Sequence, residues 1–259
     1  MKRLVYQVYL GPRSKLYDFC CASVANYADA HSCDYTLQTE PILRIKPDPK
    51  TSGRSAEAVD RLGYLPIFEK ENALGYLGEY DQVAVIDADV WARPGAPNVF
   101  EDIDENAEFT AVMEREMPIT EQYRMKIRDY SRGQYPTRTG VNWNWDNGIA
   151  DFQNMGVMLM DRSLADYLHG QTPAEFLARP EFKAFVDGVG AWKWSTDQTL
   201  LNWWLRSTRV GVWPLHWKWN ALYGALVPGK VEQAHFVHFF LRDHLPNKGE
   251  DVAELVKTL

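Results

Sequence analysis

The residues that most constrain the fold of this chain are the apolar run 83–86 and the carboxylates that follow it, Asp87 and Asp89. Four consecutive apolar residues, mostly β-branched, are typical of a strand buried on both faces, as in a parallel sheet. Alternate residues of an extended chain share a face, so the two carboxylates can converge where the strand ends. Open α/β sheets bind their ligands at the carboxyl ends of their strands. The sequence therefore predicts a ligand site at Asp87, Ala88 and Asp89.

Two neighbouring carboxylates favour a bound cation. Side by side they repel, and each raises the pKa of the other unless a positive charge lies between them. Oxygen ligands suit hard divalent cations, so Mg²⁺ or Mn²⁺ is the expected occupant. The alternative is that Asp87 only caps the turn after the strand, because Asp-X-Asp also occurs often by chance.

Strands and helices alternate along the first half of the chain. This order is typical of an α/β fold with a doubly wound, mostly parallel sheet flanked by helices, of the Rossmann-like kind. No Gly-X-Gly-X-X-Gly follows the first strand and no Walker-type Gly-Lys-Ser/Thr occurs, so neither a dinucleotide nor a P-loop nucleotide is indicated. The expected strands are 4–10, 35–39, 81–87, 109–113, 152–160, 210–215 and 235–240, and the expected helices are 17–31, 56–77 (broken at 63–66), 99–103, 173–186 (interrupted near Pro180), 196–206 (capped by Ser195 or Thr196) and a short one from 250.

Composition narrows the function classes. The formal net charge is −7 and no basic run occurs, so nucleic acid is not an expected partner, because an acidic chain gains no affinity from counterion release. Cys20, Cys21 and Cys33 indicate reduced thiols of a cytoplasmic protein. The apolar N-terminal run is short and broken by Gln7, which predicts a strand and not a signal peptide. No stretch approaches the length of a membrane span, so no integral membrane segment is expected.

Three other segments carry polar residues that suit a metal and phosphate site. Asn154 and Gly156 place an amide and a residue without a side chain on a strand. The pair 197–198 starts a helix, where backbone N–H groups and the helix dipole favour anions. His235 and His238 offer imidazoles, which suit Mn²⁺ better than Mg²⁺. Three residues apart on a strand, the two histidines face opposite ways, so only one can be a ligand.

In this order, these segments resemble the GT-A fold glycosyltransferases of family 8, the glycogenin-like and galactosyltransferase-like group. Each motif is weak alone, whereas the ordered set is fairly specific. The matching segments are 80–90, 154–159, 197–202, 219–220 and 238–239. The resemblance implies a single GT-A-like domain over 1–249, with a nucleotide-sugar-binding half (1–113) and an acceptor-binding half (114–249), followed by a short C-terminal helix or tail (250–259).

The resemblance implies that Asp87 and Asp89 hold Mn²⁺ or Mg²⁺ on the diphosphate of a sugar nucleotide, with a C-terminal histidine as the third ligand. His238 is favoured over His235 because it precedes Phe239. The metal would act as a Lewis acid that stabilises the departing nucleoside diphosphate.

The resemblance also implies residues around the donor. Gln198 would lie near the anomeric carbon, and Asp197 would bind sugar hydroxyls or cap its helix. Lys70 stands where the family often has a donor-binding Arg, with a solvated helix charge as the alternative. The other expected donor contacts are Ala88, Asn154 and Gly156, with Tyr6 or Tyr9 either stacked on the base or buried in the core.

Tryptophans concentrate in the second half of the chain. The long polar stretch 114–149 is predicted to be a functional loop. Its Trp143 and Trp145 are candidates for packing on the C–H face of an acceptor sugar. Other tryptophans within regular elements are expected in the core, namely Trp203, Trp204 and Trp213.

The sequence thus predicts a metal-dependent glycosyltransferase that uses a nucleoside diphosphate sugar, taken as a UDP-sugar, and a carbohydrate or glycoconjugate acceptor, with retention as in family 8. The match is incomplete, because the Gly and Lys-Pro-Trp that follow the family's histidine are missing, which leaves Arg242 or Lys248 as the phosphate-binding cation. The alternatives are a sugar nucleotidyltransferase, for which 11–15 is a faint echo of a glycine-rich loop, and a non-catalytic carbohydrate-binding protein.

Overall fold

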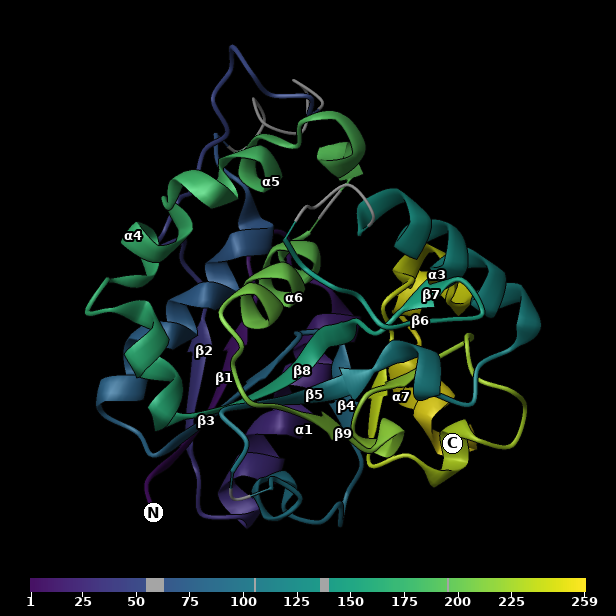
Figure 1. The fold of residues 1–259 in the computed structure, drawn as a ribbon. Coiled ribbons are helices and arrows are strands. Elements are labelled where there is room, and N and C mark those ends of the chain that lie inside the picture. Colours follow the sequence, from purple (N-terminus) through teal and green to yellow (C-terminus); the bar gives the residue numbers. More distant parts are fainter. Residues whose placement is uncertain (55–62, 105, 136–139, 195) are drawn as a thin grey trace.

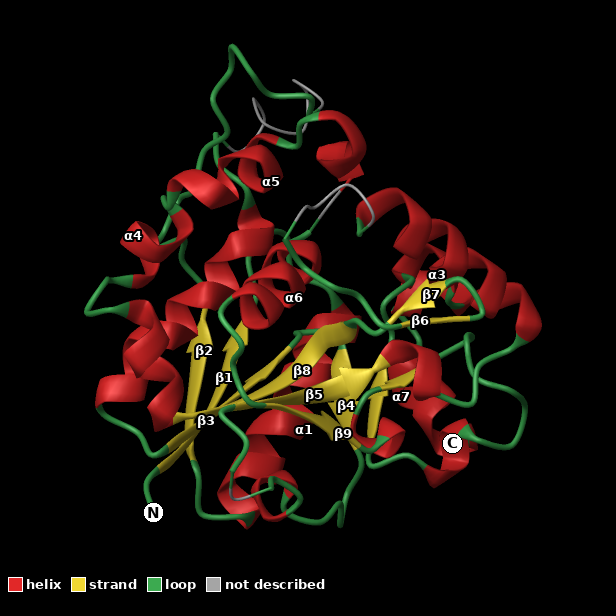
Figure 2. Ribbon diagram, in the orientation of Figure 1, coloured by secondary structure: helices red, strands yellow, loops and turns green. Residues whose placement is uncertain are grey.

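The computed structural model describes residues 1–54, 63–104, 106–135, 140–194 and 196–259. Its centre is a six-stranded sheet in the order β2-β1-β3-β8-β5-β9 (Figure 1, Figure 2). Only β8 runs antiparallel to its neighbours in this sheet, so the expected mostly parallel sheet is confirmed. The strands are β1 (Arg3–Val8), β2 (Asp34–Gln38), β3 (Gln82–Ile86), β5 (Phe109–Met113), β8 (Gln153–Asp161) and β9 (Val212–Leu215).

Side chains of the sheet alternate between two cores, one on each face. Val83 and Val85 of β3 pack with the helices on one face, and Ala84 and Ile86 pack with α1 on the other. Burial on both faces explains why β3 is a continuous apolar run. In Figure 1, α1 (Lys15–Ala30) lies below the sheet. The opposite face is covered by a 3₁₀ run, Pro66–Gly78, and by α4 (Pro173–Leu177), α5 (Lys183–Asp187) and α6 (Asp197–Ser207).

A small second sheet brings the C-terminal part of the chain to the end of β3. It has the order β10-β11-β4, from Ala221–Leu222, Phe236–His238 and Val90–Ala92. β4 begins directly after Asp89, and β11 pairs with it antiparallel, with His238 opposite Val90. This pairing places a residue from the end of the chain beside the turn 87–89.

The stretch 114–149 is not the long loop that its polarity suggested. It contains α3 (Glu121–Gln134), whose N-cap Thr120 accepts a hydrogen bond from the backbone of Tyr123, and a short hairpin of β6 (Trp145–Asp146) and β7 (Ile149–Ala150). Only Ile127, Ser131 and Gln134 of α3 are buried, so few apolar residues mark this helix in the sequence.

Two predictions about tryptophans are wrong. Trp143 is buried between Tyr135 and the Arg206 guanidinium, and therefore cannot offer a free face to a sugar. Trp213 lies on the edge strand β9 and is half exposed, whereas Trp204 is in the core as expected. Trp145 remains exposed.

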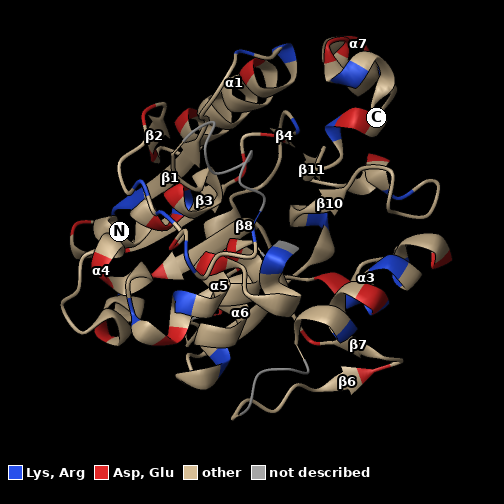
Figure 3. Cartoon of the chain, turned by 90° about the horizontal axis from the view of Figure 1, so that it is seen from above, with Lys and Arg blue, Asp and Glu red and all other residues tan. Residues whose placement is uncertain are grey.

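The other predicted elements are largely present. The second part of the 56–77 helix is the 3₁₀ run from Pro66, and residues 55–62 and 195, including one proposed helix cap, lie outside the described residues. The chain ends with the short α7 (Val252–Leu255). Acidic and basic residues are interspersed over the drawn chain, as on α3 (Figure 3). Among the described helices, none combines the length and apolar character needed to cross a membrane.

Candidate metal and donor site

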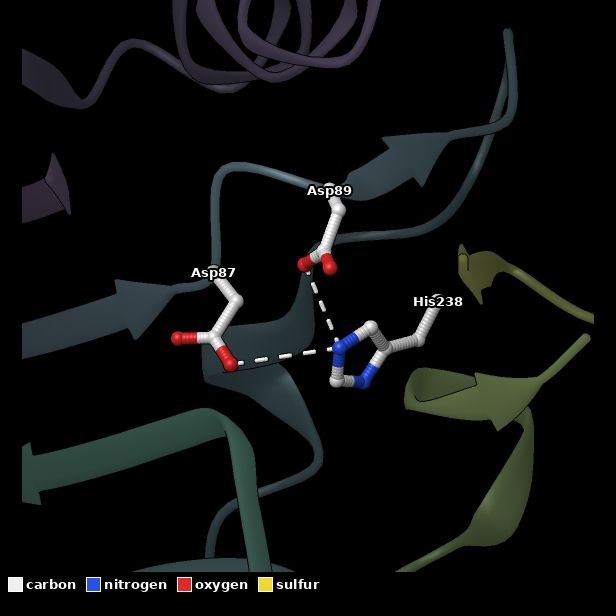
Figure 4. A group of neighbouring side chains, drawn as sticks. All are labelled: Asp87, Asp89 and His238. Carbon is white, nitrogen blue, oxygen red and sulfur yellow. Dashed lines mark ion pairs between the residues drawn. The ribbon is translucent and has the colours of Figure 1, made fainter. Parts of the chain in front are cut away.

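Two carboxylates and one imidazole converge at the carboxyl end of β3. The Nε2 atom of His238 lies 3.2 Å from Oδ1 of Asp89 and 3.9 Å from Oδ2 of Asp87 (Figure 4). One ligand atom from each of the three residues lies within 4.8 Å of the others. The local reason is the short turn between β3 and β4, which carries both carboxylates, and the pairing of β11 with β4.

Electrostatics couple this histidine to its carboxylates. Burial alone would lower the pKa of His238, but Asp89 and Asp87 outweigh burial and raise that pKa. Burial alone would likewise raise the pKa of Asp89, but the neighbouring imidazole lowers it. Without a metal, the two carboxylates therefore favour the protonated form of the ring.

A second charged cluster adjoins the first. The Nζ atom of Lys70, on the 3₁₀ run, lies 3.0 Å from Oδ1 of Asp87 and 2.8 Å from Oδ2 of Asp197, the first residue of α6. It also donates a hydrogen bond of 2.9 Å to the carbonyl of Met155. Burial would lower the pKa of Lys70, but the two carboxylates outweigh it and raise that pKa. The alternative of a solvated helix charge is wrong, because this side chain is only 14% exposed and its ammonium is paired with two carboxylates.

Asp87 and Asp89 of the first cluster and Lys70 and Asp197 of the second line one cleft of about 310 Å³. Its wall includes Ala88, Tyr9 and Tyr17. The rings of the two tyrosines meet edge to face, with their centres 5.2 Å apart. The hydroxyl of Tyr9 is already bonded to backbone groups of the turn after β1. Tyr6 is fully buried with its hydroxyl against Gln38, so it belongs to the core and cannot stack on a base.

β8 contributes its first residues to the same region. Oδ1 of Asn154 accepts hydrogen bonds from the backbone N–H of Gly156 at 3.0 Å and from Nδ2 of Asn220 at 2.7 Å. A Cβ atom on Gly156 would lie 2.5 Å from Nδ1 of His238, so only glycine leaves room for this ring. Oε1 of Gln198 accepts from the backbone N–H of Met155 at 3.3 Å.

The remaining candidates lie apart from the metal cluster. His235 packs on Trp219, with the ring centres 4.6 Å apart, and is not in the group of three. Arg242 lies over the ring of Tyr17 at 5.7 Å, at the side of the cleft. The side chain of Lys248 is mostly exposed and faces Asp243.

Sequence reasoning missed Glu114, Tyr17 and the role of Asn220. Glu114 directly follows β5, which runs parallel to β3, so the argument used for Asp87 could have found it. It is buried, and its Oε2 accepts a hydrogen bond of 2.9 Å from Asn154. The family resemblance marks the segment 219–220 but not the role of Asn220, because the position of this residue depends on the pairing of β10 with β11.

Neither a protein-family model nor a curated protein matches this sequence. Similar solved structures exist, at low identity. A glycosyltransferase involved in the glycosylation of the major capsid of PBCV-1 has 12% identity and a TM-score of 0.50, with 100% of each chain covered. Mouse xyloside xylosyltransferase 1 has 13% identity and a TM-score of 0.53, with 95% of this chain and 100% of that chain covered. An active-site mutant of LgtC has 13% identity and a TM-score of 0.51, with 99% and 96% covered. The chain therefore has a GT-A type fold.

Gly156→Ala is expected to leave the protein folded but to displace His238, because the new methyl group occupies the position of the ring. Isothermal titration should show Mn²⁺ binding at least about tenfold weaker than in the wild type. Gly78→Ala is the control, since a Cβ there meets nothing within 4 Å. Equal Mn²⁺ affinity in both variants would contradict a tightly packed ring.

Glu71, next to Lys70 in the sequence, carries a buried carboxyl group in an unusual environment. Its side chain is buried beside apolar residues such as Leu74 and Trp204, and no other described residue donates a hydrogen bond to either carboxylate oxygen. Burial raises the pKa of Glu71 well above its ordinary value. The carboxyl group is therefore more readily protonated in the folded state than in the unfolded chain.

A folded-state pKa above the unfolded one means that this group's stabilisation is complete below the unfolded pKa and is lost as pH rises through the folded pKa. Glu71→Met should consequently raise the free energy of unfolding at pH 8 by about 1–3 kcal/mol, and by less at pH 4. Thermal or urea denaturation at both pH values measures this. Exposed Glu79 is the control, and Glu79→Met should change stability by less than about 0.5 kcal/mol. A lower free energy of unfolding for Glu71→Met at pH 8 would contradict this expectation and show that the ionised carboxylate stabilises the fold.

Proposed function

We propose that this protein is a metal-dependent glycosyltransferase that uses a nucleoside diphosphate sugar as its donor. The observation that carries the proposal is the convergence of Asp87, Asp89 and His238. The two carboxylates line one cleft together with Lys70 and Asp197. The GT-A type fold supports it, because the similar structures are those of glycosyltransferases.

The three proposed ligands fit a divalent cation chemically. Two carboxylate oxygens and one imidazole nitrogen form a mixed oxygen and nitrogen set, which suits Mn²⁺ better than Mg²⁺. When bound, the cation would supply Lewis-acid stabilisation of the negative charge on the leaving diphosphate. The rest of the proposed chemistry belongs to side chains of this chain.

Lys70 is proposed to place a positive charge at a fixed position on the donor side of the cleft. Its ammonium is held by Asp87, Asp197 and a backbone carbonyl, so it is already oriented before a ligand arrives. Asp197 is proposed to accept hydrogen bonds from sugar hydroxyls, and Gln198 on the next position to lie near the anomeric carbon. Gln198 keeps its amide nitrogen available for such a contact, because the bond to Met155 uses only its oxygen.

Further details follow the family resemblance: a UDP-sugar as donor, retention of configuration, and base contacts from Tyr9. Tyr17, which lines the cleft, and Arg242, which lies over its ring, are further candidates for contacts with the base and the phosphates. Trp145 is kept as the acceptor-binding candidate because its ring is exposed.

Thermal-shift titrations with UDP, GDP, CDP, dTDP and ADP, each with and without Mn²⁺, test the donor. A ligand at 100 times its Kd stabilises the native state by about 2.7 kcal/mol, which for a chain of this size raises Tm by roughly 5–10 °C. A shift that requires Mn²⁺ and one particular base is expected, followed by consumption of the corresponding nucleotide sugar with an acceptor. A response only to a nucleoside triphosphate with a sugar phosphate would favour a nucleotidyltransferase, and a response only to free glycans would favour a binding protein.

Asp89→Asn and His238→Ala should each weaken Mn²⁺ binding by at least about 100-fold, since even indirect partners of metal ligands cost 10–100-fold. Both variants should also abolish the Mn²⁺-dependent shift with the nucleoside diphosphate. His235→Ala is the matched control and should keep wild-type affinity, because its ring lies outside the cluster. If His235→Ala were the weaker binder, the assignment of the third ligand would be wrong.

A further inference from the structure

A chain of buried hydrogen bonds leads from α3 to the imidazole of His238. The hydroxyl of Tyr123 donates to Oε1 of Glu114 at 2.6 Å, and Nδ2 of Asn154 donates to Oε2 of Glu114 at 2.9 Å. Nδ2 of Asn220 donates to Oδ1 of Asn154 at 2.7 Å, and Oδ1 of Asn220 lies 2.9 Å from Nδ1 of His238. All of these residues except Tyr123 are buried, and Asn220 is fully so.

A backbone group fixes the direction of the hydrogen bonds that link Glu114, Asn154, Asn220 and His238. The N–H of Gly156 can only donate, and it points at Oδ1 of Asn154 at 3.0 Å. The amide nitrogen of Asn154 must then face Glu114, whose carboxylate accepts. The nitrogen of Asn220 must face Asn154, which leaves its oxygen facing Nδ1 of His238. Since that oxygen can only accept, Nδ1 carries the proton.

The consequence appears at the other ring nitrogen. In a neutral imidazole only one nitrogen carries a proton, so a proton on Nδ1 leaves the lone pair on Nε2. Nε2 is the atom that faces Asp87 and Asp89. The opposite tautomer would set a lone pair on Nδ1 against the oxygen of Asn220 and would turn an N–H toward the cation position.

We propose that Asn220 is a positioning residue that holds His238 in the Nδ1–H tautomer and so prepares Nε2 as the third metal ligand. Asn154, oriented by Gly156 and Glu114, holds Asn220 in turn. Asn154 thereby acts first as a structural support, since both of its amide atoms already have partners. This inference rests on the proposed metal site, because the Nδ1–H tautomer matters only if Nε2 binds a metal. Hydrogen bonds of this kind to a ligating histidine fix its orientation and raise its basicity.

The test reads the tautomer and the metal affinity separately. Long-range ¹H–¹⁵N spectra of metal-free, ¹⁵N-histidine-labelled protein at alkaline pH report which nitrogen of His238 is protonated, with the signal assigned by its loss in His238→Gln. The wild type is expected to show the Nδ1–H form. Asn220→Ala should give a mixture of tautomers and Mn²⁺ binding weaker by about 10–100-fold in calorimetry. Asn220→Asp keeps an oxygen facing Nδ1 and should retain the Nδ1–H form.

Asn72→Ala controls for the loss of an amide elsewhere. Asn72 donates hydrogen bonds to Tyr6 and Gln38, which are not part of the hydrogen-bond series that ends at His238. A neutral wild-type ring with its single proton on Nε2 would overturn the inference, whether or not any variant folds. Unchanged tautomer and Mn²⁺ affinity in Asn220→Ala would also overturn it. Absence of Mn²⁺ binding in the wild type, with the Nδ1–H form present, would instead contradict the metal proposal.

Discussion

The structure depends on compensating three carboxylates that meet at the carboxyl end of β3. Asp87 and Asp89 come from the turn after the strand, and Asp197 comes from the start of α6. A buried charge without a partner costs several kcal/mol, so these groups can be brought together only if cations come with them. Lys70 from the 3₁₀ run and His238 from β11 supply that charge. Each of these two cations lies on an element that also contributes apolar side chains to a buried core, so the packing of the fold brings the opposite charges together.

Sequence reasoning succeeded where the determinants are local. The apolar run 83–86 reports burial on both faces, and the position of Asp87 and Asp89 follows from where that run stops. The choice between His235 and His238 rested on a weaker argument, and the observed separation of the two depends on how β11 pairs with β4. The antiparallel direction of β8 was equally hidden, although it decides that Asn154 and Gly156, at the beginning of a strand, meet the ends of β3 and β5.

The second half of the chain is harder to predict from the sequence, because the same residue types serve in its candidate binding positions and in its core. Trp143 has polar neighbours in sequence, but it packs in space on Tyr135 and under Arg206. Trp213 belongs to a regular element, yet β9 is an edge strand, and one side of such a strand can face solvent. α3 escaped detection for the converse reason, since a mostly exposed helix has few apolar positions to reveal its period. Only contacts between residues distant in sequence distinguish a buried tryptophan from an exposed one, or this exposed helix from a loop.

Asp87 links the two halves of the site, because its two oxygens serve different partners. Oδ1 pairs with Lys70, while Oδ2 faces the imidazole of His238. A cation on the histidine side therefore need not displace the ammonium. Without metal, with all three carboxylates ionised and both Lys70 and His238 protonated, the cluster would carry one net negative charge, which disfavours an anionic ligand. A divalent cation beside a neutral ring would bring the same cluster to neutrality and leave the cleft able to accept a diphosphate. The tautomer that Asn220 imposes is the one that permits this exchange, since it keeps the ring's lone pair directed at the carboxylates once the proton has left.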